Sequence, residues 1–320
     1  MTNCLLIFPN NLFKIKYLPK GVKQVFIIED PLFFEEKERI EKYSKLKLVL
    51  HRASMKYYQD HLKENNFQVK YIEFNKVKKN TFLKKYQEIH HFELADHLLK
   101  ERLEKSLKKS QELIVYDSPL FLLTLDDLDE YQKHKGKSKT FFHKHFYDWQ
   151  LKKLDIPYIS KSYDTENRNA VPKNMDMPQV PKNDNNSDYV KEAKRYVNKN
   201  FSKNYGDVEN FVFPITHKTS KKWIKKFLKE RLKNFGTYQD AILEKKSFMF
   251  HSLLAPMINI GLIAPRDLIN YTIKYYEKHK KEVKINNFEG FIRQVIGWRE
   301  YERMLYQLDY KNQVSSNYFG

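Results

Sequence analysis

A chain of 320 residues with 41% hydrophobic and 15% aromatic residues has enough apolar surface for a packed interior, which excludes global disorder and fits two domains. Its formal net charge of +19 suits a partner that carries phosphates, although lysine-rich faces are commonly only solvated surface. No apolar run approaches about 18 residues and no leader sequence opens the chain, so we expect a soluble intracellular protein, in cytoplasm or nucleus, without a membrane partner.

The first half of the chain alternates between apolar strands and helical stretches. Helices are predicted over residues 53–65 and 140–151, and strands over residues 5–8, 24–29, 69–74, 89–94 and 113–116. This alternation predicts βαβ units and a parallel, Rossmann-like sheet. Because ligands of such sheets bind beyond the carboxyl ends of the strands, residues 9–12 and 29–32 form the candidate rim.

The second half is predicted to be helical and to follow a linker. Residues 160–188 are rich in Pro, Asn, Asp and Ser and lack periodicity, which is typical of a linker. An apolar stripe over residues 223–235 predicts a helix with Gly236 as its C-cap. A further helix is predicted over residues 247–258, ended by Gly261, and Pro265 is expected to begin the next one.

These elements predict a two-domain organisation. We expect an α/β domain at residues 1–155, a linker at residues 156–188 and an all-α domain at residues 189–320.

The most informative segment of the chain is Gly-Phe-Ile-Arg-Gln-Val-Ile-Gly-Trp-Arg-Glu-Tyr at residues 290–301. Apolar residues recur at steps of three and four from 288 to 305, which predicts an amphipathic helix. The pattern by itself favours a core helix with a basic solvent face. The residue order resembles the flavin-binding helix of the photolyase–cryptochrome superfamily, most closely the branch of bacterial (6-4) photolyases that carry an iron–sulfur cluster.

Three further blocks carry the same resemblance, in the order that the family has them. Residues 213–216 and 235–241 look like the entry to the flavin domain, and residues 251–262 are similar to the Ser-x-Leu-Ser-Pro-Tyr-Leu segment of the superfamily. Residues 163–168 resemble the Asp-x-Glu-Asn-Arg linker signature of that branch. The resemblance implies an antenna-like first domain, followed by an incomplete flavin domain that ends before the family's later half.

The resemblance also implies a bound FAD. Ser252 and Arg293 would contact its phosphates, whereas Tyr238 and Trp298 would wall its ring system, with Leu253 beside them. From residue type alone, Ser252 is a small helix-packing residue and Arg293 a surface charge. The single cysteine, Cys4, is predicted to be buried. An iron–sulfur cluster needs about four thiolates or close substitutes, so a chain with one cysteine is expected not to hold one by itself.

Damaged DNA is the partner that the resemblance and the charge together suggest. Gln294 and Arg299 would border the lesion side of the flavin pocket. A basic helix face would contact phosphates, or else be only a solvated surface. Its lysines are Lys221, Lys222, Lys225, Lys226 and Lys229.

In the related photolyases a ribityllumazine antenna binds near a Gly-Asp-Gln turn after the first strand. The matching turn here is Pro9-Asn10-Asn11, so Asn10, Asn11 and Glu29 are the candidate antenna residues. The change of carboxylate and glycine in this turn puts the antenna chromophore in doubt. No metal site and no catalytic residue is assigned, because His143 and His145 fall on different faces of a helix and are expected to be solvated.

The leading hypothesis is therefore a photolyase-related flavoprotein that repairs pyrimidine (6-4) or dimer lesions by light-driven electron transfer to a flipped base. One alternative is a non-catalytic or split-gene half that binds DNA or a companion polypeptide. In that case we expect the apolar side of the helix at 288–305 to be exposed. Another alternative is a cryptochrome-like light sensor.

Overall fold

The computed structural model describes residues 2–36, 42–77, 81–137, 140–163, 166–167, 169–179 and 187–317. Positions 164, 165 and 168 of the predicted linker signature, and residues 180–186 of the predicted linker, lie outside these ranges. The chain forms two compact units. Unit 1 comprises residues 1–120, 181–223 and 254–264, and unit 2 comprises residues 121–180, 224–253 and 265–320. These units interleave along the chain, and the continuous division at residues 155 and 188 stays a prediction.

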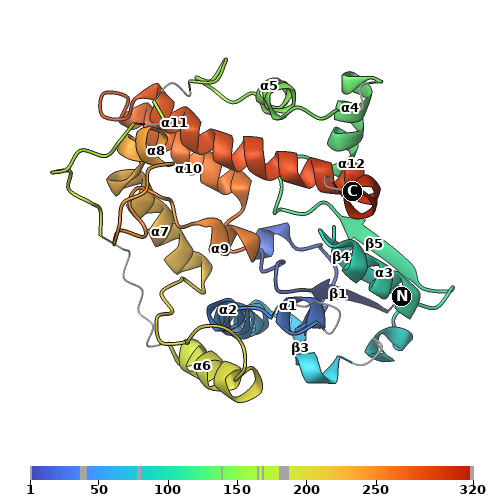
Figure 1. The fold of residues 1–320 in the computed structure, drawn as a ribbon. Coiled ribbons are helices and arrows are strands. Elements are labelled where there is room, and N and C mark those ends of the chain that lie inside the picture. The colour runs from blue at the N-terminus through green and yellow to red at the C-terminus, as the bar shows by residue number, and fades with distance from the viewer. Residues whose placement is uncertain are drawn as a thin grey trace. The chain divides into compact units, whose positions relative to one another are not determined.

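Unit 1 is built on a five-stranded parallel sheet with the strand order β3-β2-β1-β4-β5 (Figure 1). The predicted α/β fold class is thereby confirmed, and each predicted strand lies within two residues of an observed one. The strands are β1 (Asn3–Ile7), β2 (Gln24–Ile28), β3 (Gln68–Ile72), β4 (Glu88–Phe92) and β5 (Glu112–Tyr116). Leu5 of β1 pairs with Val25 on one side and with His90 on the other, so the strand order reverses around β1.

Helices pack around this sheet in unit 1. They are α1 (Pro31–Phe34), α2 (Lys45–Glu64), α3 (His97–Ser106), α6 (Asp188–Asn200) and α9 (Ala255–Asn259), with short 3-10 turns at Ile15–Tyr17, Phe74–Lys76 and Thr81–Lys85. Apolar side chains from alternate strand positions, including Leu6, Phe26 and Ile89, pack with Leu99 and Leu103 of α3 into a core. Cys4 is fully buried in this core, as predicted, and burial raises the pKa of its thiol to about 12.

The helix α2 begins earlier than its pattern predicts. It starts after Ser44, whose side chain accepts the Lys47 N–H, rather than near residue 53. Residues 48–55 of its first turns are all buried, so they show no apolar stripe against a polar face. A helix buried on several sides therefore escaped a search for amphipathic periodicity.

Unit 2 is helical, as predicted for this part of the chain. Its elements are α4 (Leu125–Lys135), α5 (His143–Leu154), α8 (Leu232–Tyr238), α10 (Pro265–Lys278), α11 (Ile285–Ile292), a π-helical segment (Arg293–Trp298) and α12 (Arg299–Ser315), while α7 (His217–Glu230) begins in unit 1. Pro265 begins α10, as predicted. Among the described helices, none is long and apolar enough to cross a membrane.

Two predictions about helix ends in the second half were wrong. Gly236 lies inside α8, where a Cβ atom would come within 2.3 Å of the Asn286 carbonyl oxygen, so its role is close packing rather than capping. The predicted helix over residues 247–258 is reduced to α9, because Met249 and Leu253 take positive φ values of 36° and 58°. The spacing of apolar residues in this segment does not predict the turn that precedes α9.

The C-terminal helical region runs from α11 through the π-helical segment into α12. Its apolar side is buried: Phe288 stacks on Tyr276 at 4.2 Å, and Phe291 contacts the ring of Phe227 at 4.5 Å. The expectation that a half-domain would expose this side is therefore wrong, since helices α7 and α10 supply the partners. Trp298 is the exception and remains 42% exposed.

Candidate functional site

The π-helical segment Arg293–Trp298 is the structural centre of the candidate site. An i→i+5 turn inserts one residue into a helix, and such insertions are frequent at functional sites. Gly297 makes the close approach of α5 possible in this segment. A Cβ atom there would lie 3.1 Å from His143 Nε2 and 3.2 Å from Arg293 Cγ and Tyr147 Cδ2.

Arg293 is held in place by a buried carboxylate. Its Nε lies 3.3 Å from Oε1 of Glu289, which is fully buried. The Tyr147 hydroxyl donates to the same oxygen at 2.9 Å, and the Tyr163 N–H donates to the other oxygen at 3.3 Å. Burial and the neighbouring Glu289 raise the pKa of Tyr147, so this hydroxyl stays a donor.

His143 stacks on Trp298, with ring centroids 4.0 Å apart and an angle of 19° between the planes. Burial, with a further contribution from Arg293, lowers the pKa of His143, so the ring is neutral at neutral pH. The prediction that this histidine is solvated was wrong, whereas His145 is exposed as predicted. Packing across two helices, rather than the His-x-His spacing, determines the surroundings of His143.

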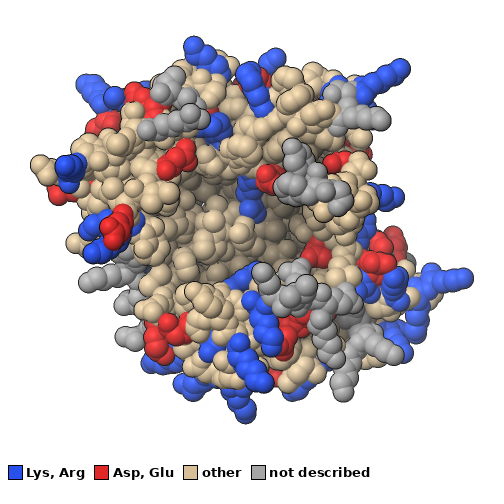
Figure 2. All heavy atoms as spheres, viewed as in Figure 1, with Lys and Arg blue, Asp and Glu red and all other residues tan. Residues whose placement is uncertain are grey.

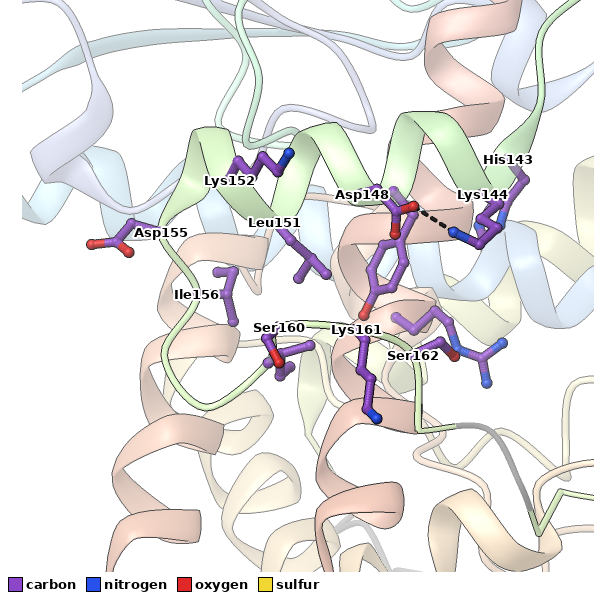
Figure 3. A pocket seen from close by; sticks show the side chains of 13 residues that line it. His143, Lys144, Asp148, Leu151, Lys152, Asp155, Ile156, Ser160, Lys161 and Ser162 are labelled. Carbon is purple, nitrogen blue, oxygen red and sulfur yellow. Dashed lines mark hydrogen bonds and ion pairs between the residues drawn. The ribbon is translucent and has the colours of Figure 1, made fainter.

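A cavity of about 860 Å³ opens beside these residues (Figure 3). It is bounded by α5, by the chain segment at residues 155–162 and by Arg293. Leu151, Ile156 and Ile159 supply its apolar wall, and Figure 3 shows the Lys144–Asp148 ion pair on the exposed side of α5. Volumes of this order accommodate small-molecule ligands.

A second polar cluster lies on another side of the same π-helical segment. Gln294 Nε2 donates to the side-chain oxygen of Gln239 at 3.0 Å, and His251 Nε2 donates to the Gln239 carbonyl oxygen at 2.8 Å. Ser252 and Leu253 follow His251 directly in the turn before α9 and are half-buried. Three of the four recognised sequence blocks therefore meet at the Gln239–Gln294–His251 cluster.

The predicted flavin residues are thus found in two groups. Tyr238, whose ring lies 5.5 Å from that of Phe250, belongs with Ser252 and Leu253 near the Gln239–Gln294–His251 cluster. Arg293 and Trp298 pack instead against α5. Neighbouring positions of a helix point in different directions, so Arg293 and Gln294 contact different groups although they are adjacent in sequence.

Arg299 has a third environment. Its guanidinium lies 5.3 Å from the ring centroid of Phe121, beside Arg303 at 4.3 Å from the same ring. Burial lowers the pKa of Arg299. Next to it the fully buried Glu300 accepts the N–H groups of Leu122 and Leu123 at 3.0 and 3.3 Å. These contacts tie α12 to the segment before α4, a structural role that the prediction for Arg299 did not include.

The lysines predicted for a DNA path do share one exposed face of α7. Lys221, Lys222, Lys225 and Lys229 are exposed, whereas Lys226 is half-buried and lies 3.9 Å from Glu230. Trp223 and Phe227 bury the opposite face. On the face of the molecule in Figure 2, Lys and Arg are dispersed among acidic residues. Whether the α7 lysines contact DNA stays a prediction.

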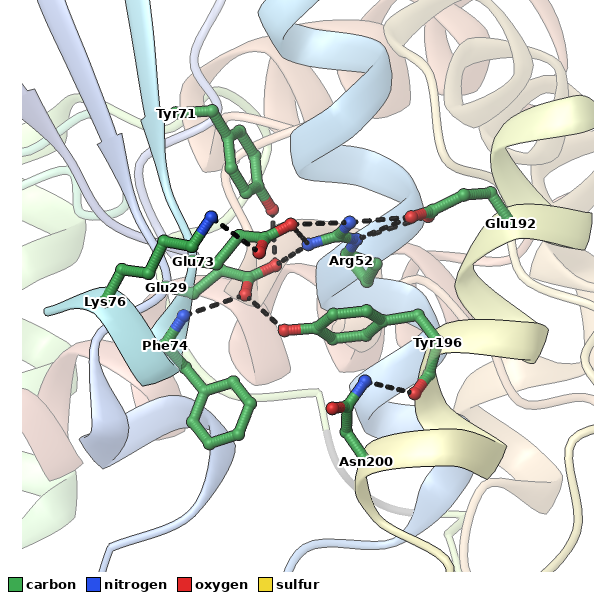
Figure 4. A network of polar contacts seen from close by, with 9 residues as sticks. All are labelled: Glu29, Arg52, Tyr71, Glu73, Phe74, Lys76, Glu192, Tyr196 and Asn200. Carbon is green, nitrogen blue, oxygen red and sulfur yellow. Dashed lines mark hydrogen bonds and ion pairs between the residues drawn. The ribbon is translucent and has the colours of Figure 1, made fainter.

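Two of the antenna candidates of unit 1, Asn11 and Glu29, make side-chain hydrogen bonds within the chain. Asn11 is fully buried and accepts the Phe8 N–H at 3.3 Å, whereas Asn10 is half-buried. Glu29 lies just after β2, where Arg52 and Tyr71 donate to one of its oxygens at 2.9 and 2.5 Å (Figure 4).

The other oxygen of Glu29 accepts the Tyr196 hydroxyl at 2.9 Å and the Phe74 N–H at 3.1 Å. Glu73 and Glu192 complete the surroundings of Arg52. Because four donors already bind its carboxylate, Glu29 is a structural residue of the sheet edge.

Sequence reasoning assigned no role to His143, Tyr147, Glu289 or Gln239. The i,i+4 spacing of His143 and Tyr147 places both on one face of α5, which is a weak signal for a shared function. Their partners lie more than 140 residues away, as the Tyr147–Glu289 pair illustrates with a separation of 142. Among the described residues, no group of three or more His, Cys, Asp or Glu side chains is arranged to hold a metal ion.

Fold and site together define an α/β sheet unit with Rossmann-like strand order and a helical unit with a polar π-helical centre. The sequence pattern of the family described as "Deoxyribodipyrimidine photo-lyase-related protein" matches residues 5–213. The chain belongs to this family. The resemblance inferred from the sequence blocks is thereby confirmed at the level of the family.

Individual relatives match parts of the chain. An uncharacterized protein of Acanthamoeba polyphaga mimivirus, R852, is 39% identical over 189 residues, which is 54% of this chain and 96% of that protein. The (6-4) photolyase of Agrobacterium fabrum is 36% identical over 158 residues, 49% of this chain but 31% of the photolyase. A crystal structure of an archaeal photolyase from Sulfolobus tokodaii is 12% identical with a TM-score of 0.49, covering 96% of this chain and 60% of that one. The chain therefore spans less than two thirds of both photolyases.

Proposed function

We propose that this chain is a flavoprotein that binds FAD in unit 2 and serves the light-driven repair of pyrimidine lesions in DNA. The observation that carries the proposal is the convergence of separate family blocks at the Gln239–Gln294–His251 cluster. Membership of the photolyase-related family supports it. Reduced FAD, when bound, would supply the electron for repair.

The residues near this cluster fit a flavin in chemical type. Ser252 offers a hydroxyl for a phosphate, and the Tyr238 ring offers an apolar surface for an aromatic ring system. Gln239 and Gln294 present amides that donate or accept hydrogen bonds to a ring edge or a base. Arg293 and Trp298 would act from the α5 side, by fixing the π-helical segment that carries Gln294.

The test is flavin binding followed by repair. Purified chain is titrated with FAD while absorbance and melting temperature are recorded, then assayed under blue light on duplexes with one (6-4) photoproduct or one cyclobutane dimer. We expect Ser252→Ala and Gln294→Ala to weaken FAD binding or repair by about tenfold each, in line with the loss of one charged or buried hydrogen bond. The exposed-lysine variant Lys281→Gln is the matched control. A colourless protein whose melting temperature ignores saturating FAD would refute cofactor binding by this chain.

A second candidate function is a non-catalytic or partner-dependent member of the family. It is favoured by the match with R852. That match covers 96% of R852 but only 54% of this chain. R853, another uncharacterized mimivirus protein, is 42% identical over 83 residues, or 26% of this chain. A relative of this chain can therefore be much shorter than the Agrobacterium photolyase. This function predicts damaged-DNA binding without lesion turnover, whereas a cryptochrome-like sensor predicts photoreduction of bound flavin without either.

A further inference from the structure

We propose that the cavity between α5, residues 155–162 and Arg293 is a second ligand site, which binds a nucleotide through its phosphate. This inference goes beyond the flavin proposal, because the cavity lies on the α5 side of the π-helical segment. It concerns one ligand chemistry with two sources, a free nucleotide or one nucleotide of a nucleic acid strand. The cavity volume of about 860 Å³ is sufficient for a ligand of this size.

The charge of the cavity wall favours an anion. Lys144 and Asp148 neutralise each other at 2.6 Å, as Figure 3 shows. Among the described residues, the remaining charged side chains that line the cavity are Lys152, Lys161, Arg293 and Asp155. In Figure 3 the carboxylate of Asp155 turns away from the other labelled side chains. Lys152, Lys161 and Arg293 therefore bring positive charge to the described lining, with Arg293 already paired to Glu289.

Arg293 is the fixed element of this wall. Glu289 holds it at the Nε edge, and the Tyr147 hydroxyl and the Tyr163 N–H hold Glu289 in turn. A guanidinium anchored at one edge and lining a cavity is preorganised for a planar or tetrahedral anion, so less side-chain entropy is lost on binding.

The other wall residues match the two ends of a nucleotide. Ser160 and Ser162 carry hydroxyl donors beside Lys161, in the manner of phosphate-binding segments. Leu151, Ile156 and Ile159 form an apolar surface for a base or sugar. The neutral ring of His143 lies at the α5 end, fixed by its stack on Trp298. Phosphate donors and an apolar wall in one cavity select a phosphorylated ligand with an apolar body.

The test uses GMP, since guanine is neither the base of FAD nor a pyrimidine of a lesion. Isothermal titration of the full chain, with and without saturating FAD, should show GMP binding, and guanosine or inorganic phosphate should bind at least about tenfold more weakly. The double variant Lys161→Gln/Ser162→Ala should weaken GMP binding by about tenfold or more. Both side chains are exposed, so the melting temperature of the ligand-free variant should stay unchanged. Lys281→Gln is the control for loss of one exposed lysine from the same unit.

Further experiments distinguish the two sources of the ligand and separate GMP binding from FAD binding. Ser160→Trp fills the cavity and should abolish GMP binding while FAD binding persists, whereas Ser252→Ala should weaken FAD and spare GMP. If the double variant also weakens a fluorescent 12-residue DNA strand and GMP competes with that strand, the source is nucleic acid. If strand binding is unchanged, the source is a free nucleotide. GMP that leaves the titration flat at millimolar concentration, or that binds the double variant and wild type equally, would overturn the proposal whatever the result with FAD.

Discussion

Arg52 in unit 1 and Arg293 in unit 2 have similar immediate surroundings but different roles. Each is bound to a fully buried glutamate that also accepts a tyrosine hydroxyl. Arg52 donates to three carboxylates, Glu29, Glu73 and Glu192, and its side chain is 4% exposed. Although burial opposes its charge, these carboxylates raise the pKa of Arg52 above its ordinary value.

Arg293, by contrast, contacts Glu289 through Nε, is 12% exposed and lines a cavity. Arg52 is thus surrounded by carboxylates, whereas Arg293 also borders the cavity that we propose as a ligand site. In unit 1, helix α6 brings Glu192 and Tyr196 to the sheet edge and closes it. In unit 2, the chain segment opposite α5 brings two serines and a lysine, and the space stays accessible.

Replacing each arginine by alanine is the strongest way to break this comparison. Arg52→Ala leaves Glu29 buried without its cation, so we expect the free energy of unfolding to fall by about 3–5 kcal/mol. Arg293→Ala should cost less than about 2 kcal/mol, because water can reach Glu289 through the cavity, whereas Arg52→Ala also leaves Glu73 and Glu192 without their shared cation. Urea titrations followed by circular dichroism measure both values. Equal losses would mean that Arg293 is as structural as Arg52.

Two close-packed glycines of unit 2, Gly236 and Gly297, allow a second comparison of stability losses. Gly236→Ala places a Cβ atom 2.3 Å from the Asn286 carbonyl oxygen, a backbone atom of α11, so we expect a loss of about 3 kcal/mol. At Gly297 the nearest atoms, at 3.1–3.2 Å, belong to side chains that can shift, so the loss should be about 1 kcal/mol.

Gly297→Ala should nevertheless disturb the His143–Trp298 stack, which Trp298 fluorescence reports, and should weaken GMP binding. Stability losses in the reverse order would show that α5 is packed more rigidly than α11 and α8. A fluorescence spectrum identical to that of wild type would mean that Gly297 does not determine the shape of the cavity.

Glu300 allows a comparison between a buried carboxylate whose ion pair is long, 3.9 Å to Arg303, and the closely paired Glu29. Burial raises the pKa of Glu300 to about 7, and the nearest Arg303 nitrogen is 3.9 Å away. The folded protein therefore holds a proton that the unfolded chain releases near pH 4.5. Its stabilising contribution is full below about pH 4.5 and is lost as pH rises through 7.

Glu300→Gln removes this titration and keeps one side-chain oxygen, which can replace one of the two acceptors that Glu300 offers to the Leu122 and Leu123 N–H groups. We expect the melting temperature of wild type to fall relative to Glu300→Gln between pH 5 and about pH 8, with Lys281→Gln following wild type throughout. If the melting temperatures of wild type and Glu300→Gln depend on pH in the same way, the proton is bound by a group other than Glu300.

The exposed lysines of α7 carry the smallest expected effect on stability. Lys222→Gln/Lys225→Gln/Lys229→Gln should change the free energy of unfolding by less than about 0.5 kcal/mol. If the lysines contact DNA phosphates, the slope of log affinity against log salt should decrease by about 0.9 for each contact, equally for damaged and undamaged duplexes. Fluorescence anisotropy at several salt concentrations measures the slope. An unchanged slope would make this face a solvated surface.

The sequence by itself determined the elements whose signal is local. Five short runs rich in β-branched and aromatic residues predicted all five strands of the described sheet, and the central strands β1, β2 and β4 are buried along four consecutive residues each. Burial of Cys4 and the lysine face of α7 followed from the same local spacing. The ordered residue blocks also led to the family, since several motifs in fixed order are specific even where each is weak.

Only the tertiary structure decided how polar residues are grouped. Adjacent positions such as Arg293 and Gln294 point in different directions from a helix, so their partners, Glu289 and Gln239, depend on which helices pack there. The π-helical turn, the internal position of Gly236 and the closed surroundings of Glu29 all arise from contacts between segments far apart in the chain. Periodicity indicates which face of a segment is apolar, whereas the group opposite a polar side chain is fixed only when helices and strands pack within a unit.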